Sequence, residues 1–408
     1  MSAAPARRPL RLAMFTDSFY PELGGIQDSI AACAAELGAR GHQVTICAPD
    51  AAPRDFARRG LAPIELDMGP NVRVHRSPSV ALPSSSQQSR LAFTIGSGGR
   101  DAASLLPDIV HSHTFLSLGR HALRVARYSG APLVGTNHWA VGAFDFYAPV
   151  ARGVLRRLAV AAVTRYYRRC DWVTGPSAFT TSELLRSGLG RPCQVISNPI
   201  DTKAFRPLDA KGREAARRRW GLTHDTIVYA GRLAREKDLD MLLHAFAAVR
   251  ARRPGCRLVL AGHGSYRGAL QVLCRVLGVE DSVRFVGTLE HAALRDLFAA
   301  SDLFAIASKS ETQSMVVLQA MACGLPVVGV RCGGLAEYVP ADVGLLAEAD
   351  DVQDIRDKLL ALLCDPSDRR LRGAAALRFA QTVSVERVAD AWEALYARLL
   401  REWPTEGS

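Results

Sequence analysis

Short apolar runs alternate with segments of helical periodicity along most of the chain. A mostly apolar run at Leu10 to Thr16 is followed by a Gly-Gly turn, a helical pattern from Ile26 to Arg40 and a second run at Val44 to Ala48. Buried parallel strands have this near-continuous hydrophobicity, and helices usually connect them. The pattern therefore predicts a doubly wound α/β sheet. Its further strands are expected at residues 72–74, 108–111, 132–136, 172–175 and 194–197.

The same alternation resumes in the second half, with strands expected at residues 227–230, 257–261 and 303–307. A chain of 408 residues is too long for one typical core and fits two domains. An amphipathic helix is expected over residues 385–401, with Val388, Trp392, Leu395 and Leu399 at helical spacing. Residues 83–99 are rich in Ser, Gln and Gly, which predicts a loop.

The composition is that of an ordinary globular protein, with 48% hydrophobic and 22% charged residues. The first 15 residues lack the apolar core of a signal peptide, and no stretch reaches the roughly 18 apolar residues of a membrane span. The nine cysteines include no CxxC pair, which favours reduced, mostly buried thiols. We therefore expect a cytoplasmic protein without a transmembrane anchor.

The net charge of +11 is concentrated in the first half, where residues 1–200 contain 22 arginines and 13 acidic residues. Such a surface suits nucleic acid or the anionic face of a membrane, although scattered solvated charges are an equally good explanation. No aromatic-basic interleaving indicates nucleic-acid binding. Residues 150–170 are helical in composition and carry six arginines at their two ends. This pattern fits an ordinary domain helix as well as one lying on a membrane.

The most informative stretch is Ser308 to Gly329, where an apolar strand, a polar turn, a helix and another strand follow closely. A helix N-terminus presents unpaired N–H groups and a positive dipole end, so residues 313–316 offer a place for a diphosphate. The carboxylate of Glu311, just before it, would accept hydrogen bonds from hydroxyl groups. A phosphate site beside a polyol site suggests a nucleotide sugar.

The sequence SETQSMVVLQAMACGLPVVG resembles the signature of the retaining family 4 glycosyltransferases of GT-B fold. In that family two glutamates, eight positions apart, hold hydroxyls of the transferred sugar and of the ribose. The resemblance gives Glu311 the first role, but Gln319 occupies the second position. A neutral hydrogen bond contributes about 0.5–1.5 kcal/mol, against roughly 1.5–3 for a charged one. A nucleotide-sugar-binding protein without turnover therefore remains an alternative.

Other site residues follow from the same resemblance. Arg232 and Lys237 match a motif that neutralises the leaving diphosphate, and His138 matches a histidine that donates to the sugar. Asp238 stands where most members have glycine. Asp238-Leu239-Asp240 also looks like a metal-binding motif, but acids in the first turn of a helix explain it better. The remaining donor-binding residues implied are Gly24, Gly25, Gly262, Gly264, Gln313, Ser314, Met315, Val316 and Gln319, and Gln27 is the implied acceptor contact.

His111 and His113 have a spacing that metal ligands also use, yet no nearby carboxylate or cysteine completes a site. The resemblance implies metal-independent retaining transfer of a hexose, with no cofactor beyond the nucleotide-diphosphate sugar donor.

The resemblance also implies an N-terminal acceptor domain, residues 1–200, and a nucleotide-sugar domain, residues 201–384. Both would be Rossmann-like and would face each other across a cleft, with the helix at residues 385–402 crossing back onto the first. The basic first half favours a lipid acceptor, of diacylglycerol or phosphoinositide type, and docking to the inner face of the plasma membrane. A soluble or polysaccharide acceptor is the alternative.

Overall fold

The computed structural model describes residues 8–22, 24–57, 62–81, 90–93, 106–139, 152–222 and 225–403. The chain forms two compact α/β units. The first consists of residues 1–138, 157–199 and 385–408, and the second of residues 139–156 and 200–384. The first unit is therefore completed by the C-terminal end of the chain.

The first unit is built on a seven-stranded parallel sheet in the order β3-β2-β1-β6-β7-β8-β9. The strand order reverses between β1 and β6: β2 and β3 are added on the β1 side of this pair, and β7, β8 and β9 on the β6 side. The strands are β1 (Arg11–Phe15), β2 (Gln43–Pro49), β3 (Val72–Ser77), β6 (Ile109–Ser112), β7 (Leu133–Thr136), β8 (Trp172–Gly175) and β9 (Cys193–Val195).

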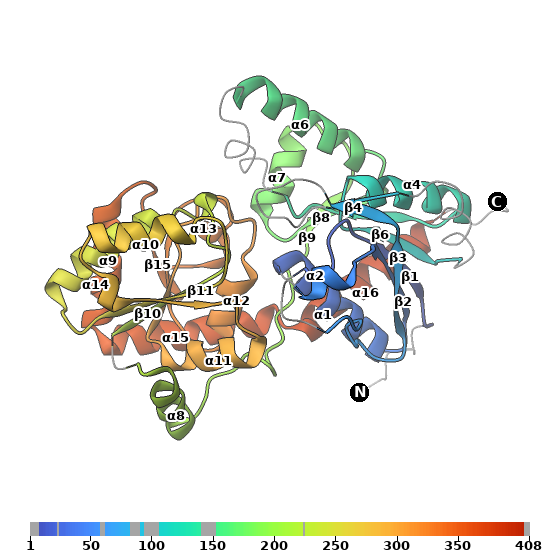
Figure 1. The fold of residues 1–408 in the computed structure, drawn as a ribbon. Helices are drawn as coiled ribbons and strands as arrows, with labels where there is room; N and C mark the ends of the chain where they lie inside the picture. The colour runs from blue at the N-terminus through green and yellow to red at the C-terminus, as the bar shows by residue number, and fades with distance from the viewer. Residues whose placement is uncertain are drawn as a thin grey trace. The chain divides into compact units, whose positions relative to one another are not determined.

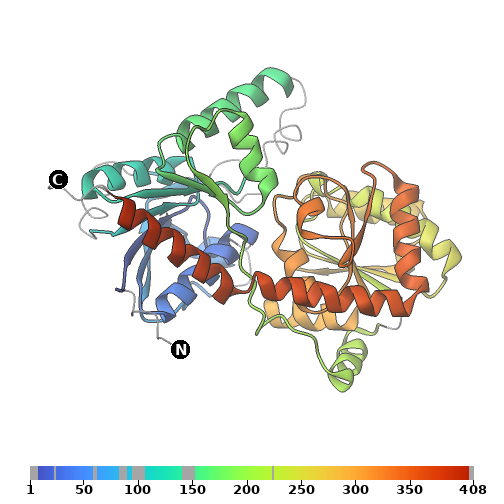
Figure 2. The same ribbon diagram turned by 180° about the vertical axis from the view of Figure 1, so that it is seen from behind.

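Helices cover both faces of this sheet. The first and last helices, α1 (Gly25–Ala39) and α16 (Val385–Glu402), pack side by side on one face, as Figure 2 shows in blue and red. Buried residues of α16 include Val388, Trp392, Leu395 and Leu399, as their spacing predicted. The other helices are α2 (Pro53–Ala57), α4 (Ser117–Ser129), α6 (Arg152–Tyr167) and α7 (Ala178–Arg186).

The second unit has a six-stranded parallel sheet in the order β12-β11-β10-β13-β14-β15. Here the order reverses between β10 and β13. Its strands are β10 (Thr226–Ala230), β11 (Arg257–Ala261), β12 (Val283–Gly287), β13 (Leu303–Ala305), β14 (Val327–Val330) and β15 (Gly344–Ala347).

One face of the second sheet is covered by α9 (Leu239–Arg252), α10 (Arg267–Val276) and α14 (Val352–Cys364), as Figure 1 shows. The other face carries α11 (His291–Ala300), α12 (Met315–Ala322) and α15 (Pro366–Thr382), with α8 (Ala210–Trp220) against α11. Fully buried side chains such as Phe246, Phe298 and Phe304 fill the space between the layers. The doubly wound α/β architecture predicted for both halves is confirmed.

One local prediction is wrong, because a short strand lies within the segment expected to be a loop. In this strand, β5 (Arg90–Ala92), Leu91 pairs antiparallel with Val80 of β4 (Ser79–Ala81). Three residues are too few for alternation to be recognised in a polar context. Residues 83–89 and 94–99 of the expected loop lie outside the described residues. Within the described ranges, no helix is both long and apolar enough to cross a bilayer.

Candidate active site

Three of the predicted site residues, Arg232, Lys237 and Glu311, lie in loops at the carboxyl edge of the second sheet. Residues 231–237 follow β10, and residues 306–314 follow β13, so the two loops leave adjacent strands where the strand order reverses. In open α/β sheets this position is where ligands bind. The topology therefore places Arg232, Lys237 and Glu311 together, although the sequence separates them widely.

Lys237 and Glu311 form an ion pair, with Nζ 2.5 Å from Oε1. The side chains are 16% and 8% exposed. Burial alone would raise the pKa of Glu311, but attraction to Lys237, hydrogen bonds from Lys237 and Ser308, and the nearby Arg232 outweigh it and lower the pKa. Glu311 is therefore an ionised acceptor rather than a proton donor at neutral pH.

Arg232 is the second cation of this edge, and its side chain is 40% exposed. Its guanidinium lies 3.2 Å from the carboxylate of Glu236, within the same turn. The hydroxyl of Tyr229 donates to the Arg232 carbonyl oxygen over 3.0 Å and fixes the backbone at the end of β10. Both predicted cations are therefore on one short turn, and Arg232 remains reachable from solvent.

Helix α12 begins directly after the Glu311 loop. The Ser314 amide donates a hydrogen bond to the Tyr338 hydroxyl, 2.9 Å long. Met315 and Val316 belong to the first turn of the helix, where amide groups have no intrahelical acceptor. Gln313 and Ser314 are both buried. Tyr338 lies in α13 (Leu335–Tyr338) and was not predicted as a site residue. The Gly-Gly turn before this helix was its only signal in the sequence.

Gln319 lies one turn further along α12 and is only 3% exposed. Its Oε1 has no hydrogen-bond partner among the described residues. Buried amide oxygens are normally paired, and an unpaired one costs about 1–3 kcal/mol. This oxygen is a buried, unpaired acceptor on the helix that begins at the predicted donor site.

Gly262 and Gly264 are required by the packing of the protein itself. A Cβ on Gly262 would overlap the Gly231 carbonyl oxygen, and one on Gly264 would overlap that of Leu233. The loops after β10 and β11 are held together by a hydrogen bond from the Leu233 amide to the His263 carbonyl, 2.9 Å long. These glycines therefore fix the loop that carries Arg232 and Lys237, whether or not they also touch a ligand.

Asp238 occupies a left-handed backbone conformation, with φ 47°. Glycine adopts this conformation most easily, and aspartate is among the few other residues that tolerate it. Asp238 immediately precedes α9, and Asp240 lies in the first turn of that helix. Burial raises the pKa of Asp238. No cluster of three or more His, Cys, Asp or Glu residues suited to a metal ion occurs in the part of the chain that the structure describes.

In the first unit, His138 follows β7 at the carboxyl edge of the sheet and is partly exposed. Its Nε2 lies 3.1 Å from Nδ1 of His113. Burial lowers the pKa of His138 to about 4 and, together with the neighbouring imidazoles His111 and His138, lowers that of His113 further below the usual value. His138 is thus a neutral imidazole at physiological pH, able to donate one hydrogen bond.

The Gly-Gly turn follows β1 at the same edge. Gly24 has an extended backbone, with φ 171°, and Gly25 begins α1. Gln27 is buried, and its Nε2 donates to Ser18 Oγ, which in turn donates to Glu22 over 2.8 Å. The predicted acceptor contact is therefore engaged by its own chain in this structure.

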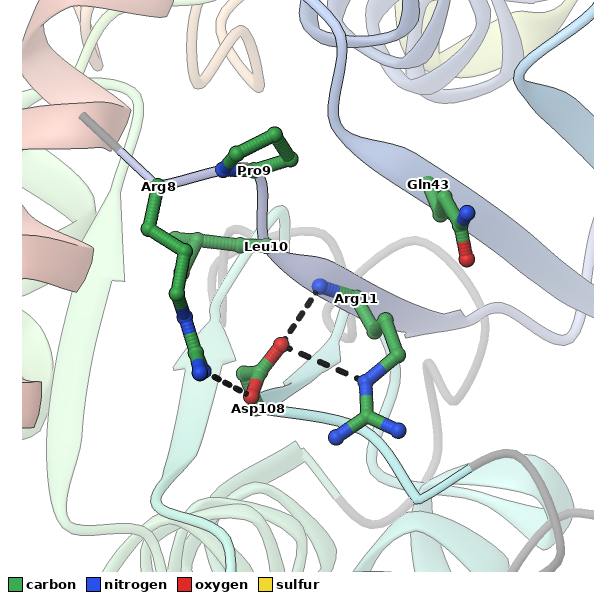
Figure 3. A pocket seen from close by; sticks show the side chains of 6 residues that line it. All are labelled: Arg8, Pro9, Leu10, Arg11, Gln43 and Asp108. Carbon is green, nitrogen blue, oxygen red and sulfur yellow. Dashed lines mark hydrogen bonds and ion pairs between the residues drawn. The ribbon is translucent and has the colours of Figure 1, made fainter. Parts of the chain in front are cut away.

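A cavity of 240 Å³ opens at the other end of the first sheet, where β1, β2 and β6 begin. Figure 3 shows Asp108 at its centre, bound to the Arg8 guanidinium at 2.7 Å and the Arg11 amide at 2.8 Å. The carboxylate is thus already satisfied. Because the strands are parallel, the cavity lies at the edge opposite His138. Its lining residues are Arg8, Pro9, Leu10, Arg11, Gln43 and Asp108.

Two family models match the chain, one in each half. The model for Glycosyltransferase Family 4 matches residues 23–204, and the model for Glycosyl transferases group 1 matches residues 212–378. The second match contains the turn with Arg232 and Lys237 and the whole of α12.

Characterised relatives and solved structures agree with these matches. The chain is 34% identical over 310 residues to D-inositol 3-phosphate glycosyltransferase of Kribbella flavida, covering 71% of this chain and 70% of the relative. It is 30% identical over 377 residues to GDP-mannose-dependent alpha-mannosyltransferase of Mycolicibacterium smegmatis, covering 90% and 92%. The crystal structure of Anabaena HepE in complex with UDP-glucose superposes with a TM-score of 0.75 at 20% identity, covering 96% of this chain and all of HepE.

Proposed function

Because this chain belongs to glycosyltransferase family 4 and is a glycosyltransferase of GT-B fold, we propose that it moves a hexose from a nucleotide-diphosphate sugar to an acceptor hydroxyl with retention of the anomeric configuration. The observation that carries the proposal is the ion pair of Lys237 and Glu311 beside the start of α12. It combines a cation for a diphosphate with an ionised acceptor for sugar hydroxyls.

In the proposed reaction, the bond between the anomeric carbon and the diphosphate oxygen breaks as the acceptor oxygen attacks from the same face. Negative charge grows on the departing diphosphate. Lys237, Arg232 and the first-turn amides of α12 would stabilise this charge, since fixed donors aimed at developing charge lower a barrier most effectively. The departing phosphate oxygen takes the proton of the acceptor hydroxyl, so no side chain has to act as a strong base.

Glu311 and His138 would orient the transferred sugar. Glu311 is ionised and can accept from two hydroxyl groups, whereas neutral His138 can donate to a third. Gln319 would accept from the ribose through its unpaired Oε1. The anomeric configuration of the product, measured by NMR during the first turnovers, tests the stereochemistry. An inverted product would rule out this mechanism.

We propose that the reaction needs no metal ion, because Arg232 and Lys237 supply two positive charges at the diphosphate. Transfer rates should be equal in EDTA and in Mg²⁺. A rate that disappears in EDTA and returns with a divalent cation would refute this part of the proposal.

The donor is proposed to be a UDP or GDP sugar. HepE was solved with UDP-glucose, and the relative from M. smegmatis is named for GDP-mannose. A thermal-shift series with UDP, GDP, ADP and their sugar conjugates tests this, because a ligand at 100 times its Kd stabilises the folded state by about 2.7 kcal/mol. No shift with any of these nucleotides would count against the donor site.

For the acceptor we propose a membrane lipid whose head group resembles an inositol phosphate, in keeping with the basic first half and with the name of the relative from K. flavida. That name equally supports a soluble inositol phosphate as the second candidate. Peripheral association with an anionic membrane would follow from the lipid acceptor. Transfer of labelled sugar to phosphatidylinositol vesicles, compared with free inositol phosphate, separates the two acceptors. Sedimentation with the vesicles in low and high salt tests the membrane association.

A further inference from the structure

Three histidines form a stack inside the first unit, and one of them, His138, is the proposed sugar-binding histidine. The His111 and His113 rings lie 4.0 Å apart, and the rings of His113 and His138 are stacked at 5.4 Å. His113 is therefore held between the two others. Its Nδ1 lies 3.1 Å from Nε2 of His138. Its Nε2 is buried and has no hydrogen-bond partner among the described residues.

This arrangement decides which ring nitrogen carries the proton in His113 and in His138. Between two facing neutral imidazole nitrogens, one must donate and the other accept. If His138 Nε2–H were the donor, the proton of His113 would sit on its Nε2, as a buried N–H group with no acceptor. If His113 Nδ1–H is the donor, only a lone pair of its Nε2 stays unpaired. Buried N–H groups without an acceptor are the rarer and costlier of these two defects.

We propose that His113 is a positioning residue that donates from Nδ1 to Nε2 of His138 and so fixes His138 as its Nδ1–H tautomer. The single N–H group of His138 is then the one on Nδ1, and it is the donor available to a ligand. A histidine without this partner would exchange its proton between both nitrogens. The functional consequence rests on the proposed role of His138, but the tautomer itself does not.

The support for His113 comes from elements far apart in the sequence. His111 is fixed at both nitrogens, by the Tyr396 hydroxyl at 2.8 Å and by Thr136 Oγ1 at 2.7 Å. Trp392 packs on the same ring, with centroids 4.5 Å apart. Because Tyr396 and Trp392 lie on α16, the last helix holds the ring against which His113 rests.

The tautomer can be measured without substrate. The full-length protein labelled with ¹⁵N-histidine should show, in long-range ¹H–¹⁵N spectra at pH 7.5, His138 with its proton on Nδ1. Its signals are assigned by their loss in His138→Gln. Finding His138 with its proton on Nε2, or averaged between both nitrogens, would overturn the proposal.

Two variants separate this role from simple packing. In His113→Asn the amide Nδ2 stands close to the position of Nδ1 and can still donate, so the His138 tautomer should be retained. In His113→Leu the donor is lost, and His138 should become a mixture of tautomers. His121→Asn is the matched control, because it replaces another buried imidazole of the first unit, one that packs against Phe15. A change of tautomer in this control, or none in His113→Leu, would contradict the assignment.

Activity provides the second readout. We expect His113→Leu to lower kcat by roughly threefold to tenfold, the value of one hydrogen bond, while the Kd for UDP or GDP stays unchanged. His113→Asn should stay within about twofold of the wild-type kcat by the same hydrogen-bond accounting. The expected tautomer in a protein that transfers no sugar would support this inference and refute the proposed function. The opposite tautomer in an active enzyme would refute this inference and leave the proposed function standing.

Discussion

The Lys237 ammonium lies 2.5 Å from the Glu311 carboxylate, across 74 residues of sequence. The pair connects the loops that follow β10 and β13, where the order of the strands reverses. A diphosphate bound here has to share Lys237 with Glu311. An ammonium group has three N–H donors and can serve both at once. The pair thus links the two loops directly.

Replacing Lys237 by Met should abolish transfer and also destabilise the fold. The variant leaves Glu311 buried without its partner, and breaking a buried pair costs about 3–5 kcal/mol. The double variant Lys237→Met, Glu311→Gln should recover much of that stability without recovering activity. Thermal unfolding and transfer assays measure both effects. Lys358→Met is the control, since Lys358 pairs with Asp354 within α14. Additive destabilisation in the double variant would show that the pair is not coupled.

Gln319 offers a test of the open acceptor in α12. Gln319→Met removes the unpaired oxygen, so the ligand-free protein should be at least as stable as the wild type, while the Kd for nucleotide rises about threefold to tenfold. Gln319→Glu should do the opposite. It places a carboxylate in a buried site, which costs stability, and binds the ribose hydroxyl more tightly. Calorimetric titration with UDP and GDP provides the Kd values. Equal affinities in all three proteins would exclude Gln319 from the donor site.

The stability of the first unit should fall in mild acid. Burial lowers the pKa of His138 to about 4 and that of His111 to about 3, and it lowers the pKa of His113 as well. Unfolded histidines titrate near 6.5, so below this pH the unfolded chain binds more protons than the folded chain. The contribution of these histidines to the free energy of unfolding is thus fully present above pH 6.5 and decreases as the pH falls towards 4. Each histidine contributes up to about 1.4 kcal/mol per pH unit.

Urea unfolding at several pH values between 7.5 and 5 measures this dependence. The variant His113→Asn removes one of the three groups and should have a shallower decrease than the wild type. Identical pH dependence in the two proteins would contradict the prediction.

Gly264 and Gly268 form a matched pair for the loop after β11. A methyl group on Gly264 would overlap the Leu233 carbonyl oxygen, whereas one on Gly268 would meet nothing within 4 Å. Gly264→Ala should lower Tm strongly and displace the turn with Arg232 and Lys237. Gly268 lies in α10, so Gly268→Ala should leave the free energy of unfolding unchanged or raise it by up to about 1 kcal/mol through helix propensity. A normal Tm and normal nucleotide binding in Gly264→Ala would show that the loop can adapt.

Tyr396 tests the attachment of the last helix. Tyr396→Phe removes the hydroxyl that pairs with Nδ1 of His111 and leaves a buried nitrogen unpaired, which should cost about 1–3 kcal/mol of unfolding free energy. Tyr128→Phe is the control, because Tyr128 is exposed. Urea unfolding followed by tryptophan fluorescence reports the loss through Trp392, which stacks on Tyr396. An unchanged midpoint would mean that this hydrogen bond contributes nothing to stability.

Local patterns in the sequence predicted much of this architecture. Most apolar runs became strands within one or two residues, because parallel strands buried on both faces leave a continuous signal. The exception is β3, which extends to Ser77, three residues beyond its expected end. The helix expected after the polar turn is α12, which begins at Met315. In contrast, β5 has only three residues, and its pairing with β4 depends on a partner strand rather than on its own pattern.

The site was predictable only one element at a time. Lys237 and Glu311 were each expected at a strand end, but their direct pairing depends on which strands are neighbours, and no local pattern encodes strand order. Tyr338, whose hydroxyl accepts a hydrogen bond from the Ser314 amide, gave no signal beyond the Gly-Gly turn before its helix, because a buried tyrosine in a short helix resembles any core residue. The same holds for Tyr396 behind the histidine stack, which was expected only as part of an amphipathic helix.

The membership of α16 in the first unit also sets the order in which the protein can be completed during translation. Residues 200–384 are synthesised before Trp392 and Tyr396, so the second unit has all of its chain while the first still lacks a helix. Domains usually fold from the N-terminus onward as the ribosome releases them. In this protein the unit that begins the chain is the last to be finished. A stop codon just after residue 384 would therefore leave the second unit whole and the histidine stack uncovered.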